Sequence, residues 1–233
     1  MTKQKDSQNL KVGVVICTLN EERSITELVK ASLKYADEVC IVDGHSTDKT
    51  VSRARKAGAV VLFEDDKGKG GAIRTAVRQK DYDIFVFMDA DLSHDPTDIP
   101  LLVSPILKGQ ADLVTGSRLL GGSDELHGTF DEFLRLSGSA FITFCINRRF
   151  GVSISDSQNG FRAGRGKMLK DLDLRENSTT IEQEMIMKAL KKGYVLTEVP
   201  AHEYRRKFGE SRISLTRQSF RYIYSMIKYL LLP

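Results

Sequence analysis

The chain has 233 residues, which is enough for one domain with a full hydrophobic core or for two small domains. Hydrophobic residues make up 41% and charged residues 28%, a composition that is ordinary for a soluble globular protein. The net charge of +4 is mild, and lysine and arginine are spread along the whole chain, so composition gives no indication of a nucleic-acid-binding protein.

Neither the cysteines nor the ends of the chain indicate an exported or membrane-spanning protein. Cys17, Cys40 and Cys145 form no Cys-x-x-Cys pair, and two of them lie in apolar runs, so we expect reduced core residues. Residues 1–10 form a polar tail without the apolar stretch of a signal peptide. No apolar run approaches the roughly 20 residues of a spanning helix, so we expect that the chain does not cross a membrane.

The first half of the chain alternates between short apolar runs and helical patterns. Strands are predicted over Val12–Cys17, Val39–Val42, Ala59–Phe63, Ile84–Met88 and Ala111–Thr115. Helices are predicted from Glu21 to Leu33, from Ser46 to Lys56, from Gly70 to Lys80 and from Asp95 to Leu107, where Pro105 would end or kink the helix. The alternation predicts an α/β fold with a doubly wound, mostly parallel sheet flanked by helices.

The second half has a different pattern. Helices are predicted over Phe130–Phe150 and Thr180–Lys192, a polar turn-like segment from Ser153 to Arg162, a strand over Tyr194–Val199, a charged loop over Tyr204–Ile213 and an amphipathic helix over Leu215–Leu232. No internal repeat or low-complexity linker interrupts the chain. We therefore predict a single domain over residues 11–214, with a nucleotide-binding half (11–122) and an acceptor half (123–214), followed by a C-terminal helix (215–233).

The sharpest chemical feature is Asp89-Ala90-Asp91, at the end of a predicted buried strand. Ligands of doubly wound sheets bind outside the carboxyl ends of the strands. Two carboxylates at such a place are costly unless something neutralises them, and Mg²⁺ or Mn²⁺ does so while also binding phosphate oxygens. The alternative is a solvated turn in which Asp91 caps the next helix.

Six other segments accompany this one. In chain order the seven read CTLNE (17–21), IVDGHSTD (41–48), KGKGGAIR (67–74), DADLSHDP (89–96), LVTGSR (113–118), DSQNGFR (156–162) and RKFGESR (206–212). Together they resemble the inverting family 2 glycosyltransferases, in particular the branch of dolichol-phosphate mannose synthases and dolichol-phosphate glucosyltransferases. Each motif alone is weak, but seven in order are specific, and they cover residues 11–214. The resemblance implies the glycosyltransferase A-type nucleotide-binding fold.

The resemblance implies a role for each matching position. The pocket for the base, ribose and diphosphate of a nucleotide sugar would be lined by Cys17, Leu19, Glu21, Ile41, Asp43, Asp89, Ala90 and Asp91. Asp91, with Asp89, would bind Mg²⁺ or Mn²⁺. Acceptor contacts would come from Arg118, Gln158, Arg162 and Arg206. The catalytic group would comprise Asp91, Arg118, Glu184, Arg206 and Arg212, in which arginine suits bidentate binding of phosphate.

Several positions depart from the family pattern or allow a second interpretation. The family's proline and tyrosine are Cys17 and Leu19, which changes base stacking, and Ser93 stands where glutamine is frequent in the synthase branch. Lys69, at a glycine-rich helix start, can hold a diphosphate, although a simple basic turn is the alternative. Glu182 and Glu184 could equally form a solvated helix face.

The predicted reaction transfers a hexose from a nucleoside diphosphate sugar, of GDP-mannose or UDP-glucose type, to a polyprenyl or dolichyl phosphate. A phosphate monoester is largely dianionic at neutral pH and needs no general base. The loop over Tyr204–Ile213, with Gly209 as hinge, could close over the donor. Aromatic and basic residues on the C-terminal helix suit an anionic bilayer, which predicts peripheral attachment at the cytoplasmic face. The alternative is a terminal helix packed on the core, and the two are compatible in part.

Three other functions remain as alternatives. A soluble glycosyltransferase acting on a saccharide hydroxyl would need a general base, for which Glu184 or Asp156 is the candidate. A nucleotidyltransferase would carry a glycine-rich loop after the first strand, where this chain reads CTLNEE. A catalytically inactive sensor of nucleotide sugars is disfavoured because the acidic and basic motif residues are intact.

Overall fold

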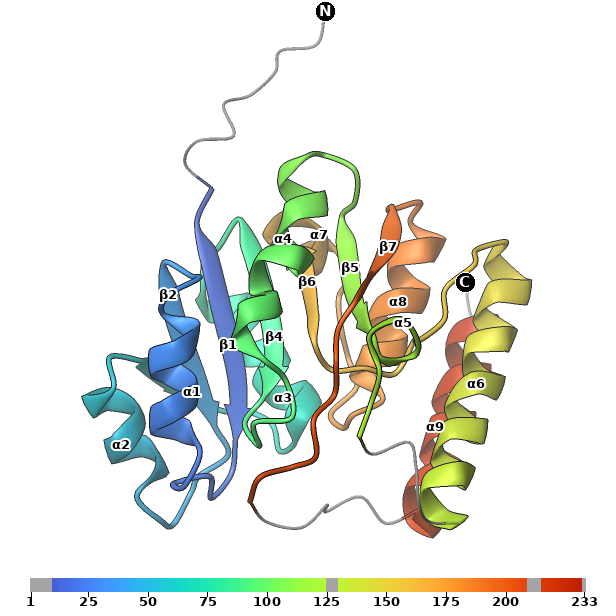
Figure 1. Cartoon of the computed structure of the whole chain (residues 1–233). Coiled ribbons are helices and arrows are strands. Elements are labelled where there is room, and N and C mark those ends of the chain that lie inside the picture. Colours follow the sequence, from blue (N-terminus) through green and yellow to red (C-terminus); the bar gives the residue numbers. More distant parts are fainter. Residues whose placement is uncertain (1–9, 125–129, 209–214, 232–233) are drawn as a thin grey trace, which may run out of the picture.

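The computed structural model describes residues 10–124, 130–208 and 215–231 (Figure 1). In these residues the strands form one sheet in the order β3-β2-β1-β4-β6-β5-β7. All neighbouring strands pair in parallel except β6, which is antiparallel to both β4 and β5. The strands are β1 (Val12–Thr18), β2 (Glu38–Asp43), β3 (Val60–Phe63), β4 (Ile84–Asp89), β5 (Leu113–Ser117), β6 (Arg162–Arg165) and β7 (Leu196–Pro200).

Helices cover both faces of this sheet. They are α1 (Ile25–Ser32), α2 (Thr50–Lys56), α3 (Lys69–Gln79), the short 3₁₀ helix η1 (Pro96–Asp98), α4 (Ile99–Leu107), α5 (Arg118–Gly121), α6 (Phe130–Phe150), α7 (Gly166–Asp171), α8 (Ile181–Lys191) and α9 (Leu215–Leu231). The predicted α/β fold with a mostly parallel sheet is therefore confirmed.

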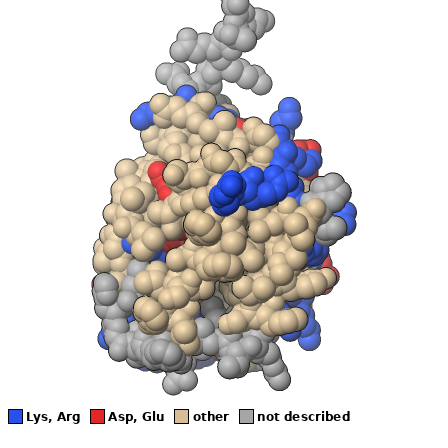
Figure 2. All heavy atoms as spheres, turned by 90° about the vertical axis from the view of Figure 1, so that its right-hand side faces the viewer, with Lys and Arg blue, Asp and Glu red and all other residues tan. Residues whose placement is uncertain are grey.

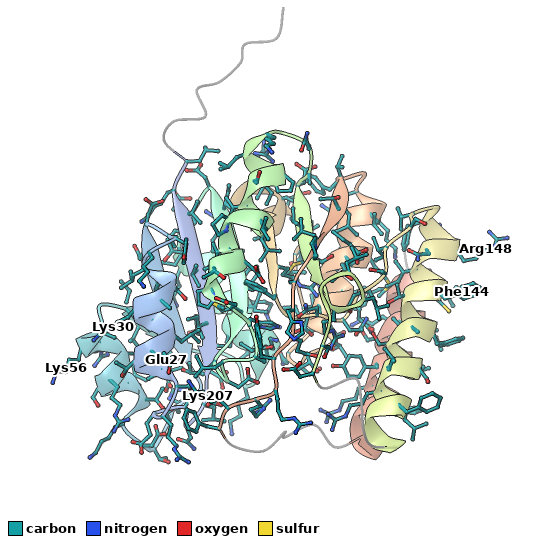
Figure 3. All side chains as sticks on the ribbon, viewed as in Figure 1. Glu27, Lys30, Lys56, Phe144, Arg148 and Lys207 are labelled. Atoms are coloured by element: carbon teal, nitrogen blue, oxygen red, sulfur yellow. The ribbon has the colours of Figure 1, made fainter. Side chains whose placement is uncertain are left out.

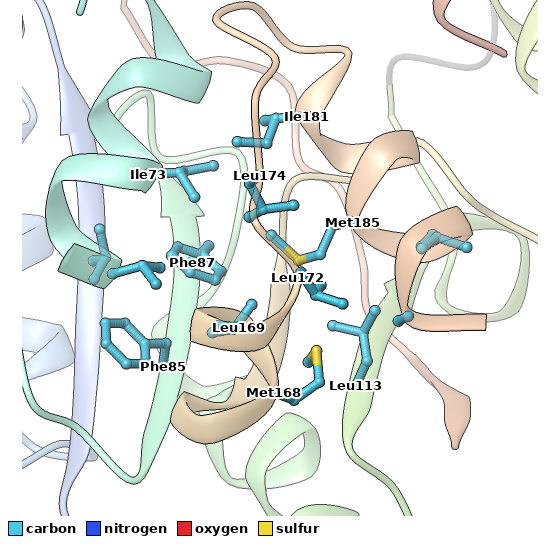
Figure 4. Packing of buried hydrophobic residues seen from close by; sticks show 14 of the residues in the cluster. Ile73, Phe85, Phe87, Leu113, Met168, Leu169, Leu172, Leu174, Ile181 and Met185 are labelled. Atoms are coloured by element: carbon cyan, nitrogen blue, oxygen red, sulfur yellow. The ribbon is translucent and has the colours of Figure 1, made fainter. Parts of the chain in front are cut away.

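The two faces follow from the alternation of side chains along each strand. On β1, Val14 and Ile16 pack with α1 and α4, whereas Val15 on the opposite face packs with α3 and α8. Figure 4 shows the second of these clusters, in which Phe85 and Phe87 of β4 lie among residues of α3, α7 and α8. Both faces of the central strands are buried, which explains why they appear in the sequence as unbroken apolar runs.

Three short elements were not predicted. Strand β6 reads Arg-Ala-Gly-Arg, which has neither apolar alternation nor β-branched residues, and it was interpreted as the end of a turn. It is buried because it is inserted between β4 and β5. The helices α5 and α7 span only four and six residues, too few to show helical periodicity in a sequence.

The helices α6 and α9 lie side by side at one edge of the molecule (Figure 1). The amide nitrogen of Gln183 on α8 donates to the carbonyl of Tyr222, which ties α9 to the body of the domain. Met226 and Tyr229 of α9 are buried, so the interpretation of the C-terminal helix as packed on the core is confirmed. No helix in the described ranges is long and apolar enough to span a bilayer.

Candidate active site

A cavity of about 460 Å³ opens at the carboxyl ends of β1, β4 and β5. Parallel pairing brings these ends together: in the register of β1 and β4, Cys17 lies opposite Asp89. The far wall of the cavity is formed by α6 and α9, through Leu134, Leu136, Ile142, Tyr222 and Ile223. The cavity therefore has a charged end at the sheet and a mostly apolar end at the two edge helices, which also contribute Arg135, Ser139 and Ser219.

The Asp89-Ala90-Asp91 segment forms the charged floor, and all three residues line the cavity. Asp91 accepts hydrogen bonds from the backbone nitrogen (3.0 Å) and the hydroxyl (2.6 Å) of Ser93, and its other oxygen lies 2.8 Å from Nη2 of Arg206. Leu92 has a φ of 64°, a left-handed conformation that costs a leucine on the order of 1–2 kcal/mol. This turn directs the carboxylate of Asp91 into the cavity.

The ammonium of Lys69 lies between two carboxylates on the same floor. Its Nζ is 2.5 Å from Oδ1 of Asp89 and 2.8 Å from Oε1 of Glu182. Burial alone would lower the pKa of Lys69, but the two carboxylates more than offset this effect and raise it. Burial likewise opposes the ionisation of Asp89, but the charge of Lys69 keeps the pKa of Asp89 below its ordinary value. The two carboxylates therefore favour the charged form of Lys69 on the cavity floor, and its contact with the donor stays a prediction.

Arg118 supplies a second fixed cation to the cavity. Its guanidinium binds Asp156 through Nε (2.6 Å) and Nη2 (3.1 Å), and Nη1 lies 3.4 Å from Glu203. Burial opposes ionisation of both partners, but their attraction raises the pKa of Arg118 and lowers that of Asp156. The predicted acceptor residues Arg118, Gln158 and Arg206 all line the cavity.

The residues that follow β1 form the side of the cavity nearest the sheet. Cys17, Leu19 and Glu21 line it as predicted, and Leu19 is 40% exposed. Burial raises the pKa of the Cys17 thiol to about 12, so it stays protonated at neutral pH. Cys17 is thus a small, nearly apolar surface at the position where the family has proline.

Two predicted donor contacts lie outside the cavity lining. The side chain of Ile41 is fully buried on the face of β2 that packs against α1, so its prediction as a side-chain contact is wrong. Asp43 is also fully buried, and its carboxylate accepts hydrogen bonds from Thr18 and from the nitrogen and hydroxyl of Ser46. Asp43 orders the loop after β2 in this structure, and its contact with a nucleotide stays a prediction.

Two further predictions are corrected. Arg162 is fully buried, and its guanidinium donates to the carbonyls of Asn159 and Glu182, so it does not face an acceptor. Glu184 is fully buried as well and accepts hydrogen bonds from the backbone nitrogens of Arg175 and Glu176. Glutamates two positions apart point to different sides of a helix, and Glu182, not Glu184, faces the cavity. Neither glutamate forms a solvated helix face.

The remaining predicted residue, Arg212, lies outside the described residues, as does Gly209. Sequence reasoning also missed cavity residues on α6 and α9 and at Asn159, Gly160 and Glu203. For α6 and α9, the sequence offered one signal: each helix combines apolar residues at helical spacing with basic residues. Gly160 lies in the DSQNGFR motif, but a glycine in a polar segment is typical of any turn and did not indicate a cavity residue.

The charges of the cavity lining suit a divalent cation. The described cavity lining carries four basic side chains and five carboxylates, so its net charge without a cation is about −1. A diphosphate would meet no net attraction there unless a divalent cation bound first. Two carboxylates one residue apart, with phosphate oxygens completing the shell, match the usual site of Mg²⁺. The described residues contain no group of three or more His, Cys, Asp or Glu side chains that could hold a metal alone.

Similar proteins have solved structures with this fold. Glucosyl-3-phosphoglycerate synthase from Mycobacterium tuberculosis, in complex with Mn²⁺, uridine diphosphate and phosphoglyceric acid, superposes with a TM-score of 0.75 at 22% identity, over 96% of this chain and 80% of that one. Another mycobacterial protein gives a TM-score of 0.78 at 22% identity, over 96% of this chain and 76% of that one. These likenesses show the fold.

Three relatives with similar sequences are named as hexose-transferring enzymes. The dolichyl-phosphate hexose transferase of Haloferax volcanii is 31% identical over 207 residues, which cover 87% of this chain and 86% of that protein. The dolichol-phosphate mannosyltransferase of Pyrococcus furiosus is 29% identical over 94% of this chain and 64% of that protein. A low-salt glycan biosynthesis hexosyltransferase of Haloferax volcanii is 31% identical over 93% of this chain, which spans about half (53%) of that protein.

The model of one protein family covers most of the domain described above. It is the model of glycosyl transferase family 2, and it matches residues 13–173, which include the DAD segment, Lys69 and Arg118. The family was predicted from the order of the motifs, and the match confirms it. The chain belongs to glycosyl transferase family 2.

Proposed function

We propose that the protein transfers a hexose from a nucleoside diphosphate sugar to a polyprenyl phosphate, with inversion at the anomeric carbon and with the help of Mg²⁺ or Mn²⁺. The dolichyl-phosphate relatives support this acceptor, and the neighbour solved with Mn²⁺ and a uridine nucleotide supports the donor class and the metal. The base and sugar of the donor are left open between the GDP-mannose and UDP-glucose types.

The observation that carries the proposal is the shape of the cavity. Its charged end suits two phosphate groups, and its apolar end is formed by Ile142 of α6 and by Tyr222 and Ile223 of α9. The same two helices continue into an exposed apolar surface. A prenyl phosphate has one charged end and one apolar end, which matches the two ends of the cavity. A saccharide instead offers hydroxyl groups along its whole length.

In the proposed reaction, a phosphate oxygen of the acceptor forms a bond to the anomeric carbon while the bond from that carbon to the donor diphosphate breaks. A divalent cation held by Asp91 and Asp89 would neutralise the charge of the leaving diphosphate. Arg118 and Arg206 would hold the phosphates in line, and this positioning is the main contribution of the protein. No proton has to be removed from the nucleophile, since the phosphate is already ionised.

The two side chains that were candidates for a general base are both engaged. Glu184 is buried outside the cavity lining, and Asp156 binds the guanidinium of Arg118 through both oxygens. A carboxylate held below its ordinary pKa by an arginine is a poor proton acceptor. This arrangement favours a phosphate acceptor over a saccharide hydroxyl.

We place the membrane at the α6–α9 face, which we define by its exposed apolar residues. On α6 these include Phe133, Phe141 and Phe144, and on α9 they are Phe220, Tyr224, Ile227 and Leu231. Figure 2 shows this side of the molecule as a broad, mostly uncharged surface with a group of basic side chains across it. Figure 3 shows Phe144 and Arg148 pointing outward from α6.

Aromatic rings beside arginines suit the boundary of an anionic bilayer, in which the rings enter the lipid and the cations meet headgroups. Docking this face on a membrane would turn the apolar end of the cavity toward the prenyl chain of the acceptor. We therefore propose peripheral attachment at the cytoplasmic face, through both edge helices.

The first experiment is a donor screen. Radiolabelled GDP-mannose, UDP-glucose and UDP-N-acetylhexosamines would each be offered with polyprenyl phosphate in detergent and Mn²⁺. We expect one donor to move label into the organic phase, and we expect the transfer to be lost with a chelator or in Asp91→Ala. Consumption of a donor only when a saccharide acceptor is added would contradict the lipid acceptor.

A further inference from the structure

The contact between Lys69 and Glu182 goes beyond the roles assigned above, because nothing in the proposed reaction yet uses Glu182. The Glu182 side chain is 5% exposed and that of Lys69 is 17% exposed, so the ion pair is largely withdrawn from water. Both residues line the cavity, together with Asp89 and Gly160. The pair therefore lies on the surface that a nucleotide diphosphate and its metal would contact.

Gly160 provides the space for this cluster. A Cβ atom at position 160 would lie 2.4 Å from Nζ of Lys69, 2.9 Å from Oδ2 of Asp89 and 3.4 Å from Oε1 of Glu182. The first of these distances is far below van der Waals contact, so any side chain would displace the ammonium. The three charged groups thus converge on a position that carries no side chain.

The main chain around Glu182 is held in place by hydrogen bonds to neighbouring segments. The buried Arg162 donates to its carbonyl oxygen at 2.7 Å and also binds the carbonyl of Asn159, which joins the start of α8 to the segment that carries Gly160. The next residue, Gln183, is bonded to α9. The main chain of Glu182 is therefore fixed and its side chain is only 5% exposed, whereas Lys69 reaches it at the end of a flexible chain from the first position of α3.

Lys69 has two carboxylate partners, Asp89 and Glu182, and the second matters when a metal competes for the first. The carboxylate of Asp89, which Lys69 contacts, would also be the one to hold a divalent cation. With Asp89 as its one partner, Lys69 would compete with the metal. With Glu182 beside it, the ammonium keeps a counter-charge, stays in the cavity and can turn toward the diphosphate.

We propose that Glu182 is a positioning residue that holds Lys69 beside Asp89, in the space left by Gly160, and so allows the metal and the ammonium to act on the donor together. The inference rests on the proposed use of a metal and a diphosphate donor, and it does not depend on the acceptor. It also assigns Glu182 a role other than that of a general base.

The test is a double-mutant cycle read out by direct binding of Mn²⁺, without donor or acceptor. Mn²⁺ affinity would be measured by electron paramagnetic resonance for the wild type, Glu182→Gln, Lys69→Met and the double variant. We expect Glu182→Gln to weaken Mn²⁺ binding by about tenfold in the wild type and by less than about threefold in the Lys69→Met background, a coupling usual for residues in contact. Equal effects in both backgrounds would overturn the proposal.

Two further variants separate positioning from loss of charge. Glu203→Gln removes a carboxylate of the same cavity that pairs with Arg118, and we expect its effect on Mn²⁺ affinity to be the same with and without Lys69. Gly160→Ala keeps every charge but places a methyl group against the ammonium, and we expect it to raise the donor KM with little change in the melting temperature. A normal donor KM for a folded Gly160→Ala would count against the proposal.

The outcome can be separated from that of the proposed function. If the enzyme transfers sugar to a saccharide but Lys69 and Glu182 remain coupled in Mn²⁺ binding, the acceptor proposal fails and the positioning role stands. If Glu182→Gln abolishes kcat with a saccharide acceptor while Mn²⁺ affinity is unchanged, Glu182 is a general base and the positioning role is refuted.

Discussion

Replacement of Arg162 by methionine distinguishes a structural arginine from one that binds the acceptor. The guanidinium donates to the carbonyl of Glu182 at 2.7 Å and to that of Asn159 at 3.1 Å through Nε. Hydrogen bonds to a charged group contribute about 1.5–3 kcal/mol each, so their loss costs about 3–6 kcal/mol. Relief from burying a cation offsets part of this, which leaves a net loss of about 2–4 kcal/mol.

For a chain of this size, that loss lowers the melting temperature by roughly 5–15 °C, which thermal unfolding followed by circular dichroism would measure. The matched control is Arg165→Met on the same strand. Arg165 is 33% exposed, pairs with Asp112 and donates a single bond to the carbonyl of Ile106, so we expect a smaller loss, of about 1 kcal/mol. An Arg162→Met protein that melts like the wild type but has a raised KM for the acceptor would refute the structural role and restore the predicted one.

Asp91→Asn should lower kcat at least about 100-fold and weaken Mn²⁺ binding, measured by label transfer and by titration; unchanged metal affinity would exclude Asp91 as a ligand. Phe144→Asp with Arg148→Glu should reduce sedimentation with anionic vesicles while leaving turnover of a short-chain, detergent-soluble acceptor intact; equal loss of both would argue against a docking face. Burial opposes ionisation of Glu38, but bonds from Lys80 and other neighbours lower its pKa to about 2, so stability present above about pH 4.5 should be lost as the pH falls toward 2, and Glu38→Gln should flatten that dependence in acid unfolding curves.

The sequence was sufficient to predict a cavity residue where the residue's position follows from the strand that precedes it. Asp89 and Asp91 stand at the end of an unbroken apolar run, and parallel pairing then places them at the same edge as Cys17. The order of motifs made the family recognisable even though single motifs were weak. Lys69 could be placed for a similar reason, because glycines open the helix that carries it.

The sequence was insufficient to predict the role of a residue where that role depends on the direction of its side chain or on a partner far along the chain. Whether Glu182 or Glu184 faces the cavity depends on the rotation of α8, which packing against the sheet fixes. Arg162 has a motif position that suits an acceptor contact, but the short strand that carries it is inserted into the sheet and buries it. That insertion is a property of the topology and leaves no local signal.

The ion pairs of the cavity have a common consequence for substrate binding. Asp91 lies 2.8 Å from Arg206, and Asp89 lies 2.5 Å from Lys69, so each proposed metal ligand is paired with a cation that a phosphate could use. Binding of metal and donor is then an exchange of partners, in which the carboxylates pass to the metal and the arginine and lysine pass to the diphosphate. With both ligands bound, all four side chains would keep a partner of opposite charge, whereas either ligand alone would take one member of each pair and separate it from the other. Metal and donor should therefore bind cooperatively, which the measured Mn²⁺ affinity with and without the nucleoside diphosphate would reveal.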